Sequence, residues 1–317
     1  MSKSLTEILG IKYPIIMAPM FLVSNKEMLI AAAKAGITGA IPALNWRTLE
    51  ELEAGVKHLK EHCPGPFGIN LIVNKSNPKY KAQLKIITDL KVDYIITSLG
   101  NPKETIELAH KNGVKVFCDV TDEKYAKKVE QLGADAVIAV NNQAGGHAGH
   151  LGPEELISKL QSTCNIPIIS AGGIGNGAEF AKMLQLGVAG CSIGSVFIAT
   201  EESGVTPEYK QACVEYGADD IVFTTKLSGT PCTVINTDYV KQIGTKQNAL
   251  ERLLNKNKQL KKWAKMVTFV RGMKSLQKAA FSATYKTVWC AGPSIEHVNN
   301  IRPVADIVND LTSSYEQ

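Results

Sequence analysis

The first two hundred residues alternate short apolar runs with stretches of helical periodicity. The apolar runs are residues 13–18, 38–42, 66–73, 92–97, 114–120, 135–140, 166–171 and 189–194. The stretches with a 3.6-residue period are 25–35, 48–62, 78–89, 102–111, 122–132, 153–163, 176–186 and 207–217. The runs are continuously apolar instead of alternating with polar residues, which indicates strands buried on both faces, as in a parallel sheet.

Strands and helices that alternate in this way predict an α/β protein with a closed parallel TIM (β/α)8 barrel. An open doubly wound sheet produces the same alternation and remains an alternative. Glycine-rich loops follow the first, third, sixth, seventh and eighth runs, whereas an open sheet concentrates its site at one switch point. We therefore favour the barrel.

The rhythm breaks after residue 217. We expect residues 218–293 to form a mainly helical insertion or lid after the eighth strand. The barrel domain would span residues 1–217, and a C-terminal helix within 294–317 would complete it, since 301–311 again has an amphipathic pattern.

The composition is that of an ordinary globular protein, with 44% hydrophobic and 21% charged residues. The longest apolar runs are far below the roughly 18 residues of a membrane-spanning helix, and the first residues lack the apolar core of a secretory signal. The seven cysteines are scattered and form no CxxC pair or zinc-ligand spacing, which favours free thiols in a reducing compartment. We expect a cytoplasmic protein that has no membrane partner.

The net charge of +5 is unevenly distributed. Residues 246–278 contain ten Lys and Arg and one acid, a local charge of +9, so the remainder of the chain sums to −4. This segment is either the solvated face of an amphipathic helix or a surface that attracts an acidic partner or small anions. Its only aromatic residues are Trp263 and Phe269, whereas nucleic-acid binding usually interleaves aromatic and basic residues. We expect no nucleic-acid partner, and the apolar helix faces in 218–291 allow a homodimer.

The strongest candidate for ligand binding lies after the seventh and eighth runs. The first of these loops contains Gly172 and Gly173 and leads into a helix, and the second contains Gly194 and Ser195. Glycines let the backbone approach a phosphate closely, and amides at a helix N-terminus stabilise its charge. This position in a TIM barrel commonly holds a ligand phosphate. No Walker-type GxxxxGK[ST] sequence occurs, which argues against a nucleotide triphosphatase.

The loop after the sixth run, residues 141–150, carries two histidines among small residues. His147 follows two glycines that would let a ligand come close, and its imidazole suits proton transfer near neutral pH. No nearby Asp, Glu or Cys supplies a third metal ligand, so we expect no metal site. His150 precedes a helix start and is interpreted as a solvated side chain.

Two further loops offer groups that a ligand could contact. After the first run, Pro19 fixes its own φ and pushes the preceding Ala18 to an extended conformation, so that the turn that continues to Met20 presents backbone groups rigidly. In the third run Asn70 offers an amide that both donates and accepts.

These loops together resemble one family. APM after the first strand, GINL in the third, AGGH after the sixth, AGGI after the seventh and IGS after the eighth are similar to the nitronate monooxygenases, formerly called 2-nitropropane dioxygenases. Members of that family are FMN-dependent TIM barrels, and the flavin-dependent enoyl-acyl-carrier-protein reductases are a sister group. The resemblance covers residues 10–245. The chain differs from the family at Gln143, where an acid is common, and in the segment 227–240, which lacks a frequent arginine.

The resemblance implies roles for matched positions. Residues of the turn after the first strand would contact the FMN ring, Asn70 would hydrogen-bond it, and the glycine-rich loops would hold its phosphate. His147 would face the substrate, and Ala144 and Gly145 would line the same loop. The cofactor-binding set is Ala18, Pro19, Met20, Asn70, Ala144, Gly145, Gly172, Gly173, Gly194 and Ser195.

The implied reaction is oxidation of an alkyl nitronate or nitroalkane by oxygen to a carbonyl compound and nitrite. Three other functions remain open. The first is NADH-dependent reduction of enoyl thioesters on acyl carrier protein, an acidic partner that the basic segment would attract. The second is tRNA dihydrouridine synthesis, although its NPGCP-like cysteine loop does not occur here. The third is a barrel that binds a phosphate-bearing ligand without catalysis.

Overall fold

The computed structural model describes residues 3–74, 77–225, 231–246, 288–313 and 315. Eight parallel strands form a closed barrel in the order β1-β2-β3-β4-β5-β6-β8-β9, and β9 closes on β1 through the pair Ile15 and Cys191. The strands are β1 (Ile15–Met17), β2 (Thr38–Pro42), β3 (Phe67–Ile72), β4 (Tyr94–Ser98), β5 (Lys115–Val120), β6 (Ala136–Val140), β8 (Ile168–Ala171) and β9 (Gly190–Ile193). Each falls on one of the eight apolar runs, with β4 extending one residue beyond its run to Ser98, so the predicted barrel is confirmed.

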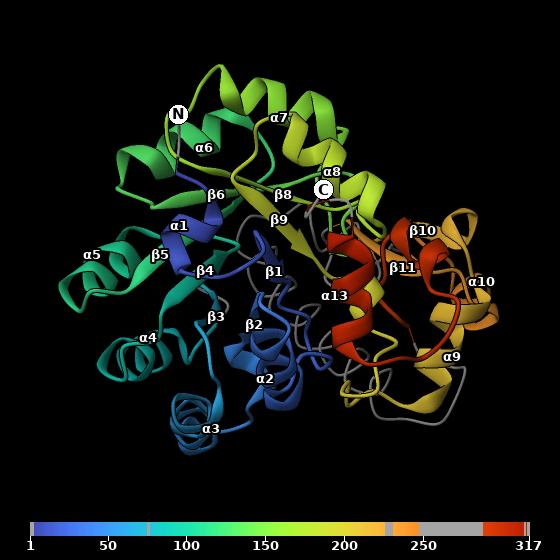
Figure 1. Cartoon of the computed structure of the whole chain (residues 1–317), viewed down its shortest axis with the longest axis horizontal. Helices are drawn as coiled ribbons and strands as arrows, with labels where there is room; N and C mark the ends of the chain where they lie inside the picture. Colours follow the sequence, from blue (N-terminus) through green and yellow to red (C-terminus); the bar gives the residue numbers. More distant parts are fainter. Residues whose placement is uncertain (1–2, 75–76, 226–230, 247–287, 314, 316–317) are drawn as a thin grey trace.

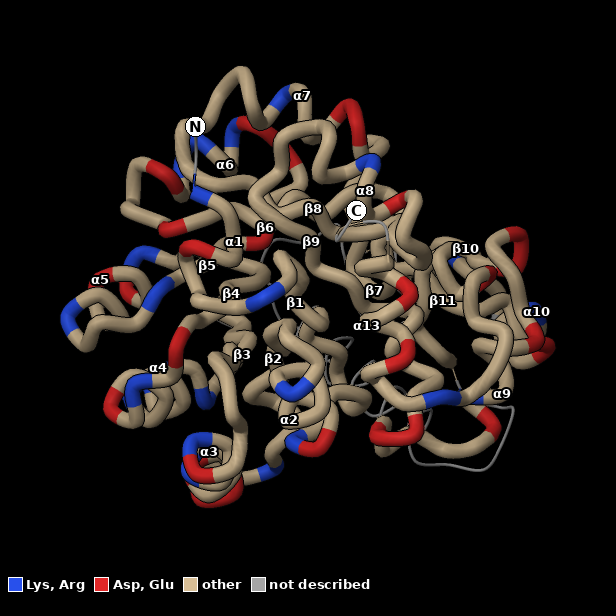
Figure 2. Tube along the Cα trace, viewed as in Figure 1, with Lys and Arg blue, Asp and Glu red and all other residues tan. Residues whose placement is uncertain are grey.

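The helices surround this barrel (Figure 1). They are α2 (Lys26–Lys34), α3 (Leu49–His62), α4 (Tyr80–Asp89), α5 (Lys103–Lys111), α6 (Glu123–Gln131), α7 (Pro153–Gln161), α8 (Gly177–Gln185) and α9 (Pro207–Glu215). Each buries an apolar stripe, as α8 does with Phe180 and Met183, and Figure 2 shows the charged residues mostly on this outer ring. The predicted C-terminal helix is α13 (Val304–Thr312), which packs against α2 and α8.

A short helix that periodicity does not reveal, α1 (Leu5–Leu9), closes the amino end of the barrel. Ser4 and Glu7 cap it reciprocally, and the backbone N–H of Leu5 donates to Ala189 O at 2.7 Å. The Leu5 side chain is fully buried in the cluster that fills the barrel. Five residues are too few for a periodic pattern, but the Ser-x-x-Glu spacing of a capping box indicates a helix start here.

Aromatic rings fill the barrel interior below the site. Tyr94 stacks on Phe117 with ring centroids 5.0 Å apart, and its hydroxyl donates to Gly39 O at 3.0 Å. A Cβ atom at Gly68 would lie 2.2 Å from the Tyr94 ring, so the strand β3 needs glycine there. This packing supports the carboxyl ends of the strands from beneath.

Substitution of Gly68 therefore tests the interior packing. We expect Gly68→Ala to lower the free energy of unfolding by about 1–3 kcal/mol, because the added methyl overpacks a buried aromatic site. Chemical denaturation measures the change. Gly217→Ala is the control, since a Cβ there would meet no atom within 4 Å. Equal stability of both variants would contradict the packing argument.

The segment after the eighth barrel strand contains strands as well as helices. In its described part, β10 (Ile221–Thr224) pairs antiparallel with β11 (Cys232–Ile235), which pairs in turn with β7 (Gly146–His147) from the loop after β6. The helix α10 (Asp238–Ile243) follows. Two strands of four residues each gave no recognisable pattern in the sequence. Residues 247–287, and with them almost all of the basic segment 246–278, lie outside the described residues, so the mainly helical lid and its domain boundaries stay a prediction.

Among the helices that the structure describes, none combines the length and the apolar character needed to span a membrane.

Candidate active site

A cavity of about 570 Å³ opens at the carboxyl ends of the barrel strands. That volume lies within the usual range of small-molecule and cofactor sites. Every residue that the sequence singled out for the site lines it: Ala18, Pro19, Met20, Asn70, Ala144, Gly145, His147, Gly172, Gly173, Gly194 and Ser195. His150, interpreted from the sequence as a solvated side chain, is exposed and lines the cavity as well.

The turn after β1 is held in a defined shape. The backbone N–H of Ala18 donates to Ile193 O at 2.8 Å, which ties the turn to β9. The N–H of Met20 donates to Ser24 Oγ at 2.9 Å, and Asn45 Nδ2 donates to Met20 O at 3.3 Å. These contacts present the turn to the cavity as a rigid edge.

A small sheet fixes the strand that carries His147. In the antiparallel pair of β7 and β11, His147 lies opposite Cys232 and Gly146 lies opposite Thr233. Thr233 Oγ1 also donates to Ala144 O at 2.7 Å. A histidine expected on a loop of small residues is therefore anchored by backbone pairing.

The imidazole of His147 is exposed to the cavity and lies among its lining residues. Desolvation by the surrounding protein lowers the pKa of His147 below its usual value. The neutral form, which can accept a proton, therefore predominates at neutral pH. This is the property that a general base at this position requires.

Asn141 joins the His147 loop to the glycine-rich loop after β8. Its Nδ2 donates to Gly172 O at 3.0 Å, and its Oδ1 accepts from the backbone N–H of Gln143 at 2.8 Å. Asn141 is 1% exposed. Sequence reasoning missed this role, although a polar residue directly after a buried strand was a possible signal.

The loops after β8 and β9 fit an anionic group. Within the described part of the chain, the backbone N–H groups of Gly173, Gly194 and Ser195 donate no hydrogen bond to protein. The Ser195 hydroxyl accepts from the N–H of Gly292 at 2.8 Å, which fixes its orientation. Uncommitted backbone donors on two neighbouring strand ends match the chemistry of a phosphate, so the donor set fits the phosphate of FMN.

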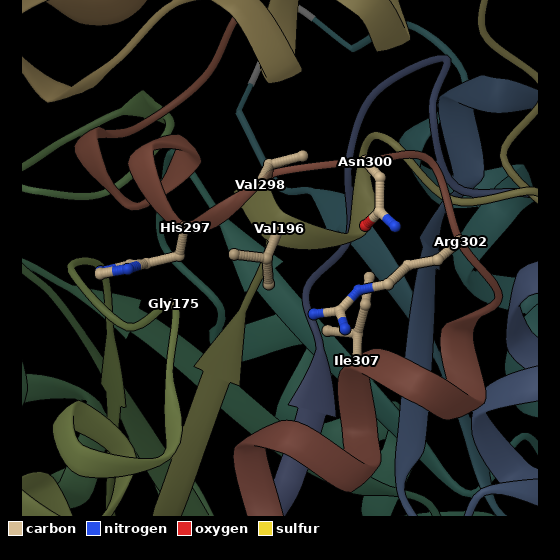
Figure 3. Close-up of a pocket in the computed structure, with 7 residues that line it drawn as sticks. All are labelled: Gly175, Val196, His297, Val298, Asn300, Arg302 and Ile307. Atoms are coloured by element: carbon tan, nitrogen blue, oxygen red, sulfur yellow. The ribbon is translucent and has the colours of Figure 1, made fainter.

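The C-terminal segment supports the glycine-rich loop from behind. The N–H of Gly175 donates to Glu179 Oε2 at 2.7 Å, and Glu179 Oε1 lies 3.1 Å from His297 Nε2. Figure 3 shows His297 beside Gly175, with Arg302 and Ile307 further along the same segment. Sequence analysis did not find this contact, because it joins residues about 120 positions apart and no local pattern records it.

A row of polar side chains crosses the cavity wall on β3, β4 and β5. Asn70 Nδ2 donates to Ser98 Oγ at 2.7 Å, and Ser98 Oγ donates to Asp119 Oδ2 at 2.5 Å. All three residues line the cavity. Ser98 and Asp119 were not predicted as site residues, yet an acid inside the apolar run 114–120 was an available signal.

Comparison with known proteins extends these observations. A family model described as nitronate monooxygenase matches residues 2–82 and 76–314. A (3aS,4S,5R,7aS)-5-hydroxy-7a-methyl-1-oxo-octahydro-1H-indene-4-carboxyl-CoA dehydrogenase of Rhodococcus jostii is 31% identical over 240 residues, which cover 76% of this chain and 67% of the relative. A probable nitronate monooxygenase of Staphylococcus saprophyticus is 26% identical over 288 residues, which cover 77% of this chain and 81% of the relative.

Among solved structures, FabK from Thermotoga maritima has the same fold over the whole chain. The TM-score is 0.85 at 28% sequence identity, and the match covers 100% of this chain and 97% of FabK.

Proposed function

Because the chain belongs to the nitronate monooxygenase family and is therefore a flavin-dependent oxidoreductase, we propose that it binds FMN and oxidises alkyl nitronates with oxygen. The products would be a carbonyl compound and nitrite. FMN, when bound, supplies the redox step between substrate and oxygen.

One observation carries this proposal. The neutral imidazole of His147 and the two loops after β8 and β9, whose backbone N–H groups suit a phosphate, line the same cavity. The N–H groups of Gly173, Gly194 and Ser195 would hold the phosphate of FMN, and the turn containing Pro19 would lie along its ring system. His147 lines the same cavity from β7 and would face the substrate.

The chain's own contribution to the reaction is orientation and proton transfer. Neutral His147 would remove a proton from the carbon beside the nitro group of a nitroalkane, and the resulting imidazolium would hydrogen-bond the nitronate oxygen. Backbone pairing of β7 with β11 keeps the imidazole in place during this transfer.

The test begins with the purified protein. We expect it to be yellow, to carry FMN, and to consume oxygen and release nitrite when a nitronate is added without NADH. Oxygen-electrode traces and nitrite determination measure both. Rapid reduction of the flavin by NADH together with no nitronate turnover would contradict nitronate oxidation.

The second candidate is oxidation or reduction of an acyl thioester. It is favoured by the 31% identity to a CoA-thioester dehydrogenase and by the likeness to FabK over the whole chain. The anaerobic spectrum of the flavin separates the candidates, because bleaching by an acyl-CoA or by NADH, and not by a nitronate, would select the thioester.

A further inference from the structure

In the polar row Asn70–Ser98–Asp119, each hydrogen bond has one defined donor and one defined acceptor. Ile96 O and Ser98 Oγ lie 3.2 and 2.7 Å from the same nitrogen of Asn70. A carbonyl oxygen such as Ile96 O only accepts, so this end of the Asn70 amide must be the NH₂ group, and both of its hydrogens are used.

Ser98 links Asp119 to Asn70 and fixes the direction of both hydrogen bonds. Its hydroxyl has a single hydrogen, which it donates to the Asp119 carboxyl at 2.5 Å. The Ser98 oxygen therefore accepts from Asn70, and the Asn70 amide cannot rotate without breaking the row. Within the described residues the Asn70 carbonyl oxygen has no hydrogen-bond partner, and Asn70 lines the cavity.

We propose that Asp119 is a positioning residue, which acts through Ser98 to hold the Asn70 carbonyl as a hydrogen-bond acceptor for the imide N–H of the flavin. This inference rests on the proposed binding of FMN. The isoalloxazine ring carries one imide N–H, and an acceptor fixed in advance binds it without losing rotamer entropy. Asp119 itself touches neither substrate nor the reacting atoms in this scheme.

The charge of Asp119 would also affect the reduction potential of a bound flavin. Burial raises the pKa of Asp119 to about 6, against the opposing hydrogen bond from Ser98. The titratable group that faces it from α6 is Tyr125, whose pKa is raised to about 12 by burial first and by Cys118 and Asp119 in addition. Asp119 therefore carries most of a negative charge at neutral pH. Because Asp119 lines the cavity, its carboxylate would disfavour added electrons on a flavin bound there, and protonation of Asp119 would remove this effect.

Two substitutions separate the charge from the hydrogen-bonded row. Asp119→Asn removes the charge but keeps an acceptor for Ser98, and Ser98→Ala breaks the row. We expect Ser98→Ala to raise the Kd of FMN about tenfold, the equivalent of one lost hydrogen bond. We expect Asp119→Asn to raise the flavin reduction potential at neutral pH and to abolish an inflection near pH 6 in its pH dependence. In the double variant the Kd should equal that of Ser98→Ala alone, because both act on one row.

The stability of the variant provides a check on folding. The folded protein favours protonated Asp119, so the stabilising contribution of this group is present below its unfolded pKa of 3.8 and is lost as the pH rises through about 6. At pH 7 the ionised carboxyl costs stability in the folded state, so the uncharged Asp119→Asn should melt no lower than the wild type. Asp89→Asn, which removes an exposed acid of α4, is the control and should leave Kd and potential unchanged.

The outcomes distinguish this inference from the proposed function. If FMN binds all variants with the wild-type Kd and with a wild-type pH dependence of the potential, the positioning role is wrong while FMN binding stands. If the wild-type protein binds no FMN, the proposed function fails and this inference fails with it. If Asp119→Asn does not fold, the Kd of Ser98→Ala decides.

Discussion

His147→Ala is expected to retain FMN and its fold but to oxidise neutral nitroalkanes 10²–10⁴-fold more slowly, the usual contribution of a general base. The imidazole lines the cavity and is held there by the pairing of β7 with β11. The backbone N–H groups proposed to bind the FMN phosphate lie on other loops, so FMN binding should survive the substitution. Steady-state kcat/KM and the flavin content of the purified variant measure the two halves of this expectation.

Comparing a nitroalkane with its preformed nitronate tests whether His147 acts in proton transfer. A preformed nitronate has already lost its proton, so its oxidation should fall much less in the variant than that of the parent nitroalkane. His62→Ala, at the exposed end of α3, is the control and should match the wild type. Loss of activity toward both substrates to the same extent would assign His147 to binding instead of proton transfer.

The pH dependence of kcat/KM for a nitroalkane should also reveal His147 as the general base. Desolvation lowers the pKa of His147, so the neutral base persists below the ordinary histidine pKa of about 6.5. We expect kcat/KM for a nitroalkane to fall only when the pH drops below that value, and we expect this limb to be absent from His147→Ala. A limb retained in the variant would belong to another group, and Asp119 is the first to examine.

Elements with strong local signals were predictable from the sequence. The barrel strands are continuous apolar runs, and their carboxyl ends meet at one edge, so residues as distant as Ala18 and Ser195 could be placed together without coordinates. The glycine-rich loops were identified for the same reason, because composition and position relative to a strand are both local properties.

Contacts between distant segments were not predictable. The strand β7 exists only because β11, more than 80 residues later, pairs with it, and His297 reaches Glu179 across an even larger separation of 118 residues. The direction of the Asn70–Ser98–Asp119 row depends on which atoms meet on three adjacent strands, which an apolar pattern does not encode. Such pairs leave no local pattern in a single sequence.

Gly172→Ala is expected to raise the Kd of FMN at least tenfold. Gly172 has φ +110°, a conformation that alanine strongly disfavours, and a Cβ there would lie 2.3 Å from Asn141 Oδ1 and 2.5 Å from the backbone nitrogen of Ala144. Relief of this overlap must separate the loop after β8 from the loop that carries His147. Fluorescence titration of the apoprotein with FMN measures the change.

A glycine of similar conformation elsewhere separates strain from function. Gly187 ends α8 with φ +81°, and the nearest atom to a Cβ there is Gln161 Nε2 at 3.3 Å, outside the cavity. Gly187→Ala should therefore lower the melting temperature through backbone strain but leave the Kd of FMN unchanged. If both variants bound FMN equally well, the loop after β8 would not hold the phosphate, and the assignment of the cofactor site would have to move to another edge of the cavity.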